Sequence, residues 1–313
     1  MTRYEAQAVA ALGAIELRPP DAFLWFGKRE SVGAGTGERL VQRIAERLHH
    51  DFFRTGTPRP LRGRLAPAAD DGGDFVRSLS QANGGRGAWQ DGWRMAGPDG
   101  DGDDGLRVVR PDGLALFAPA EHVRSAGEAV AVLQPKELRG LSPGFYIALA
   151  DSGSPGGDAL TALYWNIAAA GAATLVARVT YALNGAGLPF SLELLVDPAR
   201  YGRGDAAVLV LARADAGAAL KLLRPLLRTL GAHLAEAAPA FTKPLARGLA
   251  VAEPPAGETR FGEHRCRLLA EAIVAAGQAT AEQRLAAVRA RFAAAGLDLD
   301  TPYLQPGPAD AYS

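Results

Sequence analysis

Lys243 is the residue whose type and setting in this sequence most suggest acid–base chemistry. The chain has four lysines against thirty arginines, and Lys243 lies in the stretch Phe241–Gly248 between Thr242 and Pro244. A lysine becomes a base when its pKa is lowered, whereas an arginine keeps its charge. Pro244 also restricts the backbone at residue 243. We therefore expect Lys243 to act as a general base, against the alternative that this stretch is a loop with solvated charges.

His264 and Arg265 follow at the predicted start of a helix. Backbone N–H groups at a helix start favour anions, and histidine titrates near neutral pH. His264 is therefore our predicted proton donor to a departing phosphate, with Arg247 and Arg265 as anion ligands. The alternative is that His264 is an ordinary surface residue of the helix.

Arg203 and Asp205 come directly before a predicted central strand. They form a structural ion pair, or else Arg203 binds a phosphate through two hydrogen bonds. Tyr164 and Asn166 end an earlier predicted strand, where a tyrosine is more often a core residue than a binding group.

Neither a metal site nor a hydrolase nucleophile is expected. Only His49 and His50 are close in sequence, and adjacent helical residues do not share a face. The single cysteine, Cys266, rules out a multi-cysteine zinc site and falls on the apolar side of a predicted helix, as an inert thiol would. The sequence contains no Gly-x-Ser-x-Gly motif and no glycine-rich nucleotide fingerprint after a strand. We expect chemistry without a metal or another cofactor.

The overall composition narrows the class of protein. A chain of 313 residues can bury a sizeable core in one large domain or two. Its net charge is zero, so nothing global directs it to nucleic acid or to an anionic membrane. No apolar run reaches the length of a membrane span, and no export signal is visible. The expected location is the cytoplasm.

Periodicity predicts a mixture of helices and strands. Apolar residues at helical spacing mark helices over 3–15, 36–53, 168–185, 220–234 with a break at Pro225, 266–276 and 280–296. Short apolar or alternating runs mark strands over 106–109, 114–117, 144–150, 160–167, 190–196 and 206–212. The order is not a strict strand–helix alternation. We predict an α+β fold with a mixed or antiparallel sheet packed with helices and a helical C-terminal part.

Two polar segments divide the chain. Residues 55–73 are rich in Pro, Gly, Arg and Asp and are predicted to be a linker, and residues 96–105 a solvent loop. The predicted organisation is an N-terminal helical region with its linker over 1–75 and a larger domain over 76–313.

Several short motifs, taken together and in order, resemble a known family. They are Asn83-Gly84, Gly92-Trp93, Ser142-Pro143-Gly144-Phe145-Tyr146, Tyr164-Trp165-Asn166, Leu183-Asn184, Pro189-Phe190, Asp197-Pro198, Arg203-Gly204-Asp205, Phe241-Thr242-Lys243-Pro244-Leu245, Gly248-Leu249, Phe261-Gly262-Glu263-His264-Arg265 and Pro302-Tyr303-Leu304. Over roughly residues 75–305 the chain resembles the HopA-type effector family. That family includes plant-pathogen effectors and the lyase components of class V lanthipeptide and thioamitide biosynthesis, and the high Ala, Gly and Arg content is similar to the latter branch.

The resemblance implies a phosphoserine/phosphothreonine lyase. It would act on a ribosomally made precursor peptide that a kinase-like partner has phosphorylated, and would leave dehydroalanine or dehydrobutyrine. In this reading Lys243 and His264 are catalytic, and the substrate ligands are Arg203, Arg247, Arg265, Tyr146, Tyr164 and Asn166.

The sequence departs from the family pattern at two positions. Ala162 stands where relatives often have Arg, and Glu193 stands where they often have Lys. Both changes remove a cation from the implied phosphate site. They favour the rival hypothesis, a non-catalytic module that binds the peptide or the kinase-like partner, whereas the presence of Lys243 and His264 favours the enzyme.

Overall fold

A seven-stranded antiparallel sheet forms the centre of the molecule. The computed structural model describes residues 1–18, 21–32, 37–60, 73–96, 105–127, 129–140, 142–157, 159–257, 260–307 and 309–312. In spatial order the strands are β14 (Lys243–Ala246), β15 (Leu249–Ala252), β11 (Leu160–Trp165), β13 (Ala207–Ala212), β12 (Ser191–Leu195), β10 (Phe145–Leu149) and β9 (Glu137–Arg139). Every neighbouring pair is antiparallel. The predicted α+β class with an antiparallel sheet is confirmed.

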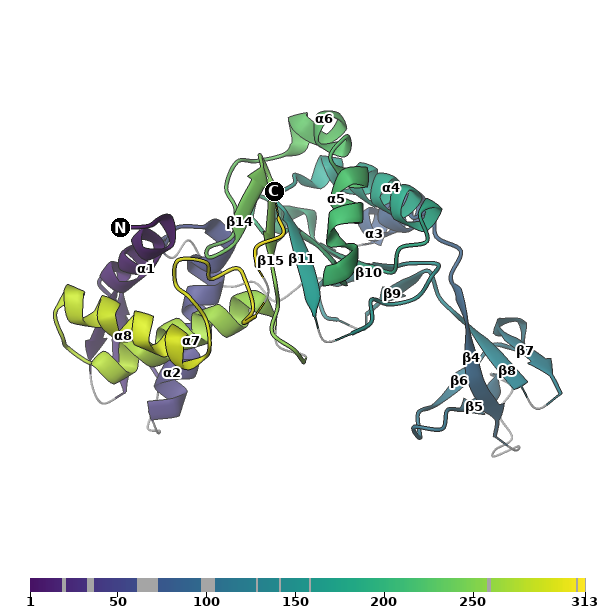
Figure 1. Cartoon of the computed structure of the whole chain (residues 1–313), viewed down its shortest axis with the longest axis horizontal. Helices are drawn as coiled ribbons and strands as arrows, with labels where there is room; N and C mark the ends of the chain where they lie inside the picture. Colours follow the sequence, from purple (N-terminus) through teal and green to yellow (C-terminus); the bar gives the residue numbers. More distant parts are fainter. Residues whose placement is uncertain are drawn as a thin grey trace.

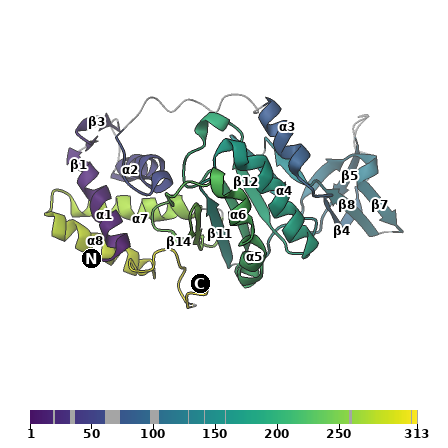
Figure 2. The same ribbon diagram turned by 90° about the horizontal axis from the view of Figure 1, so that it is seen from above.

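The strand registers assign side chains to the two faces of this sheet. Leu163, Leu192 and Leu209 lie opposite one another and are fully buried. Helices α3 (Gly73–Ala82), α4 (Ala169–Gly185), α5 (Ala216–Leu223) and α6 (Leu226–Leu230) lie on this covered face (Figures 1 and 2). The other face, which we call the open face, carries Phe145, Ala162, Tyr164, Glu193, Val208 and Val210. Glu193 and Val210 are only partly buried there.

Local sequence signals account for the main elements. Leu175, Val179 and Leu183 form the buried stripe of α4, as their spacing predicts. Pro225 separates α5 from α6, because proline cannot donate the hydrogen bond that a continuous helix needs. Thr280 and Gln283 form the predicted capping box of the last helix.

Both ends of the chain build one helical unit beside the sheet. Helices α1 (Arg3–Ala14) and α2 (Gly37–Asp51) pack on α8 (Ala281–Ala294) and α7 (Phe261–Ala276) respectively (Figure 2). A small sheet of β1 (Ile15–Arg18), β2 (Ala22–Trp25) and β3 (Lys28–Ser31) adjoins them. The predicted capping residue of α2, Thr36, lies outside the described residues.

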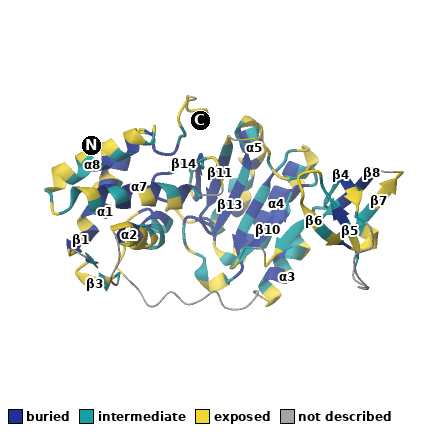
Figure 3. Ribbon diagram, turned by 90° about the horizontal axis from the view of Figure 1, so that it is seen from below, coloured by how far each residue is buried: buried dark blue, intermediate teal, exposed yellow. Residues whose placement is uncertain are grey.

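A second sheet projects from the opposite end of the molecule (Figure 1). This arm contains β4 (Ala88–Met95), β5 (Leu106–Val109), β6 (Ala115–Ala118), β7 (Val123–Ala126) and β8 (Ala129–Gln134), in the order β6-β5-β4-β8-β7. It has a small core of its own, made by Trp93, Val108, Ala118, Val130 and Val132 (Figure 3). The predicted hairpin at Pro111-Asp112-Gly113 joins β5 to β6. Most of the predicted linker 55–73 and of the loop 96–105 lies outside the described residues.

No helix in the described part of the chain combines the length and the apolar character needed to cross a bilayer.

The helical unit joins the central sheet through the ring of Phe53. This residue begins the short 3-10 helix η1 (Phe53–Thr55), and its ring lies against Tyr164 of β11 and Phe261 of α7. A Cβ added at Gly262 would lie 2.4 Å from the Phe53 ring, so glycine is required for this close approach.

We predict that Gly262→Ala lowers the free energy of unfolding by about 1–3 kcal/mol, because the buried Phe53 ring has to move. Gly217→Ala in α5 is the control, since an added Cβ meets nothing there. In urea unfolding, Gly217→Ala should keep the free energy of unfolding or raise it by up to about 1 kcal/mol. Equal stability of the two variants would contradict the role of the close approach.

Candidate functional site

Lys243 is held by the C-terminal segment. Its ammonium donates to the Asp310 carboxylate at 2.6 Å and to the carbonyl of Tyr312, and it lies 5.6 Å from the centre of the Tyr303 ring. The Tyr303 hydroxyl donates to the same carboxylate at 2.7 Å. With Asp310 in this place, Lys243 is an ion-pair partner.

His264 and Arg265 contact the same C-terminal segment from α7. Arg265 is fully buried, and its guanidinium donates to the carbonyls of Pro302 at 2.8 Å and Leu304 at 3.0 Å. It also donates to Nδ1 of His264, so that nitrogen carries no proton. Burial, and then the charge of Arg265, lowers the pKa of His264 to about 4. His264 is therefore neutral at pH 7, and a dianionic phosphate beside it would be needed to raise its pKa.

Three further predicted ligands contact neighbouring parts of the chain. Arg247 donates to the carbonyl of Leu234 at 3.1 Å, and Asn166 donates to that of Ala237 at 2.7 Å. Tyr146 lies on the covered face, where its hydroxyl donates to Glu137 at 2.7 Å and accepts from Asn83 at 3.0 Å. These contacts join loops and helices to the sheet, and a role in substrate binding stays a prediction for all three.

Arg203 belongs to a cluster of charged side chains at the junction of the helical unit and the sheet. Both oxygens of Asp205 accept from Arg203 at 2.5 Å, so the predicted ion pair is present. Arg54, which follows Phe53, lies 3.7 Å from the same carboxylate. Burial raises the pKa of Asp205, but the charges of Arg203 and Arg54 outweigh it and lower that pKa to about 2.

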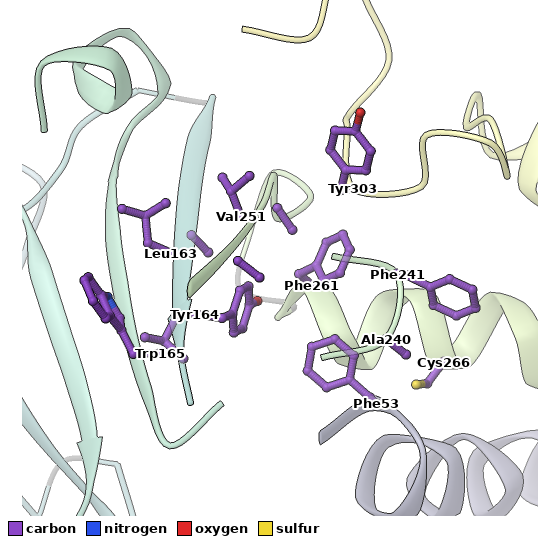
Figure 4. Close-up of a cluster of buried hydrophobic side chains, with 14 of the residues drawn as sticks. Phe53, Leu163, Tyr164, Trp165, Ala240, Phe241, Val251, Phe261, Cys266 and Tyr303 are labelled. Atoms are coloured by element: carbon purple, nitrogen blue, oxygen red, sulfur yellow. The ribbon is translucent and has the colours of Figure 1, made fainter. Parts of the chain in front are cut away.

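Tyr164 lies on the open face of the sheet, with its ring near Phe53 and near Phe261, the first residue of α7 (Figure 4). It is 6 % exposed. Burial raises the pKa of its hydroxyl, and the charge of Asp205 raises it further.

The start of α7 adds a cation to this region. Arg260 is its N-cap and provides no side-chain cap. The Arg260 guanidinium pairs with Glu193 at 2.7 Å and lies 4.9 Å from the centre of the Phe145 ring. We call the set Arg54, Arg203, Asp205, Tyr164, Glu193 and Arg260 the arginine site.

Sequence reasoning missed two of these residues, Arg54 and Arg260. Arg54 belongs to the N-terminal region, and Arg260 stands one residue before the motif that starts at Phe261. The signal that does point here is the pair of departures at Ala162 and Glu193. Strand register places both on the open face, opposite Val210 and Val208 of β13.

In the part of the chain that the structure describes, no three His, Cys, Asp or Glu residues are grouped to hold a metal ion. Cys266 is fully buried, and burial raises the pKa of its thiol, so it is an inert core residue as predicted.

We predict that Arg265→Ala loosens the C-terminal segment. The carbonyls of Pro302 and Leu304 lose a charged donor, which should cost about 3 kcal/mol in urea unfolding. Arg267→Ala, two residues away, is the control. Its side chain is 47 % exposed in pairs with Glu38 and Glu271, so its loss should cost less than about 1 kcal/mol. Similar losses in both variants would argue against the buried contacts.

Stability should fall with acidification because of His49 at the edge of the arginine site. Burial, and then the charge of Arg54, lowers the pKa of His49 to about 3. The unfolded chain binds this proton near about pH 6.5, so stability is complete above that pH and is lost as the pH falls toward 3. His264 acts in the same direction. His49→Gln should therefore flatten the decline between about pH 6.5 and 4 in urea unfolding, and an unchanged slope would contradict this assignment.

The structure is similar to that of an effector protein from Pseudomonas syringae pv. tomato strain DC3000, with a TM-score of 0.54 and 17 % identity over 97 % of this chain and 96 % of that one. An effector protein from Pseudomonas syringae pv. syringae strain 61 gives a TM-score of 0.47 and 18 % identity over 86 % and 97 %. No curated protein matches the sequence. The model of the HopA1 effector protein family matches residues 138–304, which is more than half of the sequence, and the chain therefore belongs to the HopA1 effector protein family.

Proposed function

We propose that this protein eliminates phosphate from phosphoserine or phosphothreonine in a ribosomally made peptide, leaving dehydroalanine or dehydrobutyrine. The observation that supports this most is the arginine site, where Arg54, Arg203 and Arg260 lie at the carboxylates of Asp205 and Glu193 beside the start of α7. Such a set suits a phosphate, since charged donors and a helix N-terminus both stabilise an anion. The motif resemblance to lyase components supports the same reaction.

In this proposal the peptide reaches a cavity at the end of the sheet that α3 covers. The cavity has a volume of about 450 Å³ and is lined by Tyr146 of the covered face and by Phe145, whose ring lies 4.9 Å from the Arg260 guanidinium. Val76, Pro143 and Val196 give it apolar walls, and Arg77 and Ser142 add polar ones. In this proposal the cavity receives a side chain that neighbours the phosphorylated residue.

Glu193 is the base in this proposal. Lys243 lies opposite Val251, on the covered face of the sheet, whereas Tyr164 and Glu193 lie on the open face. When a phosphate binds Arg260, Glu193 loses its partner and accepts the proton from Cα. The Cα–H electrons form the Cα=Cβ bond, the Cβ–O bond breaks, and a monoprotonated phosphoryl group leaves as hydrogen phosphate. The arginines stabilise the negative charge on the departing group.

A non-catalytic phosphopeptide-binding module is the second candidate. The observation in its favour is that Glu193 and Lys243 both have ion-pair partners, Arg260 and Asp310. In that case the arginine site holds the phosphorylated residue, and the kinase-like partner processes it.

Incubation with a phosphorylated precursor peptide tests the proposal. Mass spectrometry should show loss of the elements of phosphoric acid, whereas a phosphatase removes only the phosphoryl group and a binding module changes nothing. We predict that Glu193→Gln lowers the elimination rate at least about a hundredfold while phosphopeptide binding persists.

Lys243→Arg is the matched variant on the other face of the sheet. It keeps the charge and the pairing with Asp310 but cannot give up its proton. Near-normal elimination in Lys243→Arg supports Glu193 as the base. A hundredfold loss there, with Glu193→Gln active, would return the role to Lys243.

A further inference from the structure

We infer that Arg54, from the N-terminal helical region, forms part of a phosphomonoester-binding pocket together with Arg260 and the hydroxyl of Tyr164. This inference rests on the proposed phosphopeptide substrate and names a part of its site that lies outside the family match, which begins at residue 138.

The backbone of Arg54 is held by a hydrogen bond, whereas its side-chain Nε atom finds no partner among the described residues. Its carbonyl accepts from the backbone N–H of Gly204 at 2.7 Å, and the carbonyl of Phe53 accepts from that of Ala240 at 2.8 Å. These bonds fix the segment against the sheet. The Nε atom of Arg54 is buried without a hydrogen-bond partner, and the side chain is only 18 % exposed. A buried donor without a partner is costly, and a ligand oxygen would remove that cost.

Asp205 does not accept a hydrogen bond from Arg54. Arg203 occupies both of its oxygens at 2.5 Å, and Arg54 stays 3.7 Å away, beyond hydrogen-bond length. The carboxylate of Asp51 also lies near Arg54, but Arg47 binds it at 2.6 Å. Among the described residues, the buried Nε of Arg54 therefore has no hydrogen-bond partner and can donate to an incoming anion.

The arginine site carries an excess of positive charge. Its three guanidiniums, those of Arg54, Arg203 and Arg260, stand against the two carboxylates of Asp205 and Glu193, which leaves an excess of one positive charge. This excess favours an anion, and a phosphoserine or phosphothreonine carries about −1.5 to −2 charges at pH 7.

The pocket has a second, independent feature. The N-cap residue of the sixteen-residue helix α7, Arg260, does not cap the first turn with its side chain, and the N-terminus of a helix favours an anion. Tyr164 is 6 % exposed, and its ring lies 6.0 Å from that of Phe53, the neighbour of Arg54 in the chain. Tyr164 on β11 and Arg54 on η1 are thus brought to the same junction from two elements.

Binding measurements on the full chain test this inference. We predict that Arg54→Gln weakens binding of a phosphoserine peptide by about tenfold or more, because charged hydrogen bonds of this kind are worth that much. Binding of the unphosphorylated peptide should not change. Arg178→Gln is the control, since Arg178 is exposed on α4, on the covered side of the sheet, and the substitution should alter neither peptide's affinity.

Arg54→Lys keeps the charge and guards against a folding defect in the first variant. It should bind the phosphopeptide better than Arg54→Gln and less well than the unaltered chain, since lysine lacks the planar fork. Unaltered phosphopeptide affinity in both variants, or equal weakening for both peptides, would overturn the inference. Arg54-dependent binding without loss of phosphoric acid would refute the lyase proposal and leave the pocket standing.

Discussion

The contact between Phe53 and Gly262 is the constraint on which the arrangement of this molecule depends. It brings together segments that are two hundred residues apart, and it seats the start of α7 against the open face of the sheet. Tyr164 and Phe261 complete the aromatic group around the ring (Figure 4). Aromatic side chains bury large areas, so this junction contributes much of the packing between the helical unit and the sheet.

The same junction determines the positions of the charged side chains Arg54 and Arg260. Because Phe53 is fixed, Arg54 is carried to the edge of β13, and because Phe261 is fixed, Arg260 is carried to Glu193. Buried charges are costly unless they are paired. Arg203 and Asp205 form a close ion pair, whereas Arg54 lies 3.7 Å from the same carboxylate and is paired only in part. An incomplete pairing that packing holds in place is what a binding site for an anion requires.

The sequence predicted the individual helices and strands better than it predicted how they pair and pack. The periodicity of α4, the break at Pro225 and the capping box of α8 are local signals, and the structure confirms each of them. The partner of Lys243 is 67 residues away, and the face on which Lys243 lies depends on a strand register that no local pattern contains. The arm was also missed as a separate sheet, since its short strands reveal nothing of what they pair with.

The strand register explains how the two departures from the family pattern, Ala162 and Glu193, affect one site. Ala162 and Glu193 both lie on the open face of the sheet. The Arg and Lys that the resemblance leads us to expect at these positions would therefore be side chains of the sheet itself. Here the sheet provides a carboxylate, and the cation that meets it is Arg260, at the start of α7. Arg54 adds a second cation from the helical unit. These two cations of the site thus come from the helical unit that faces the sheet, and the sheet itself carries neither the Arg nor the Lys that the resemblance leads us to expect.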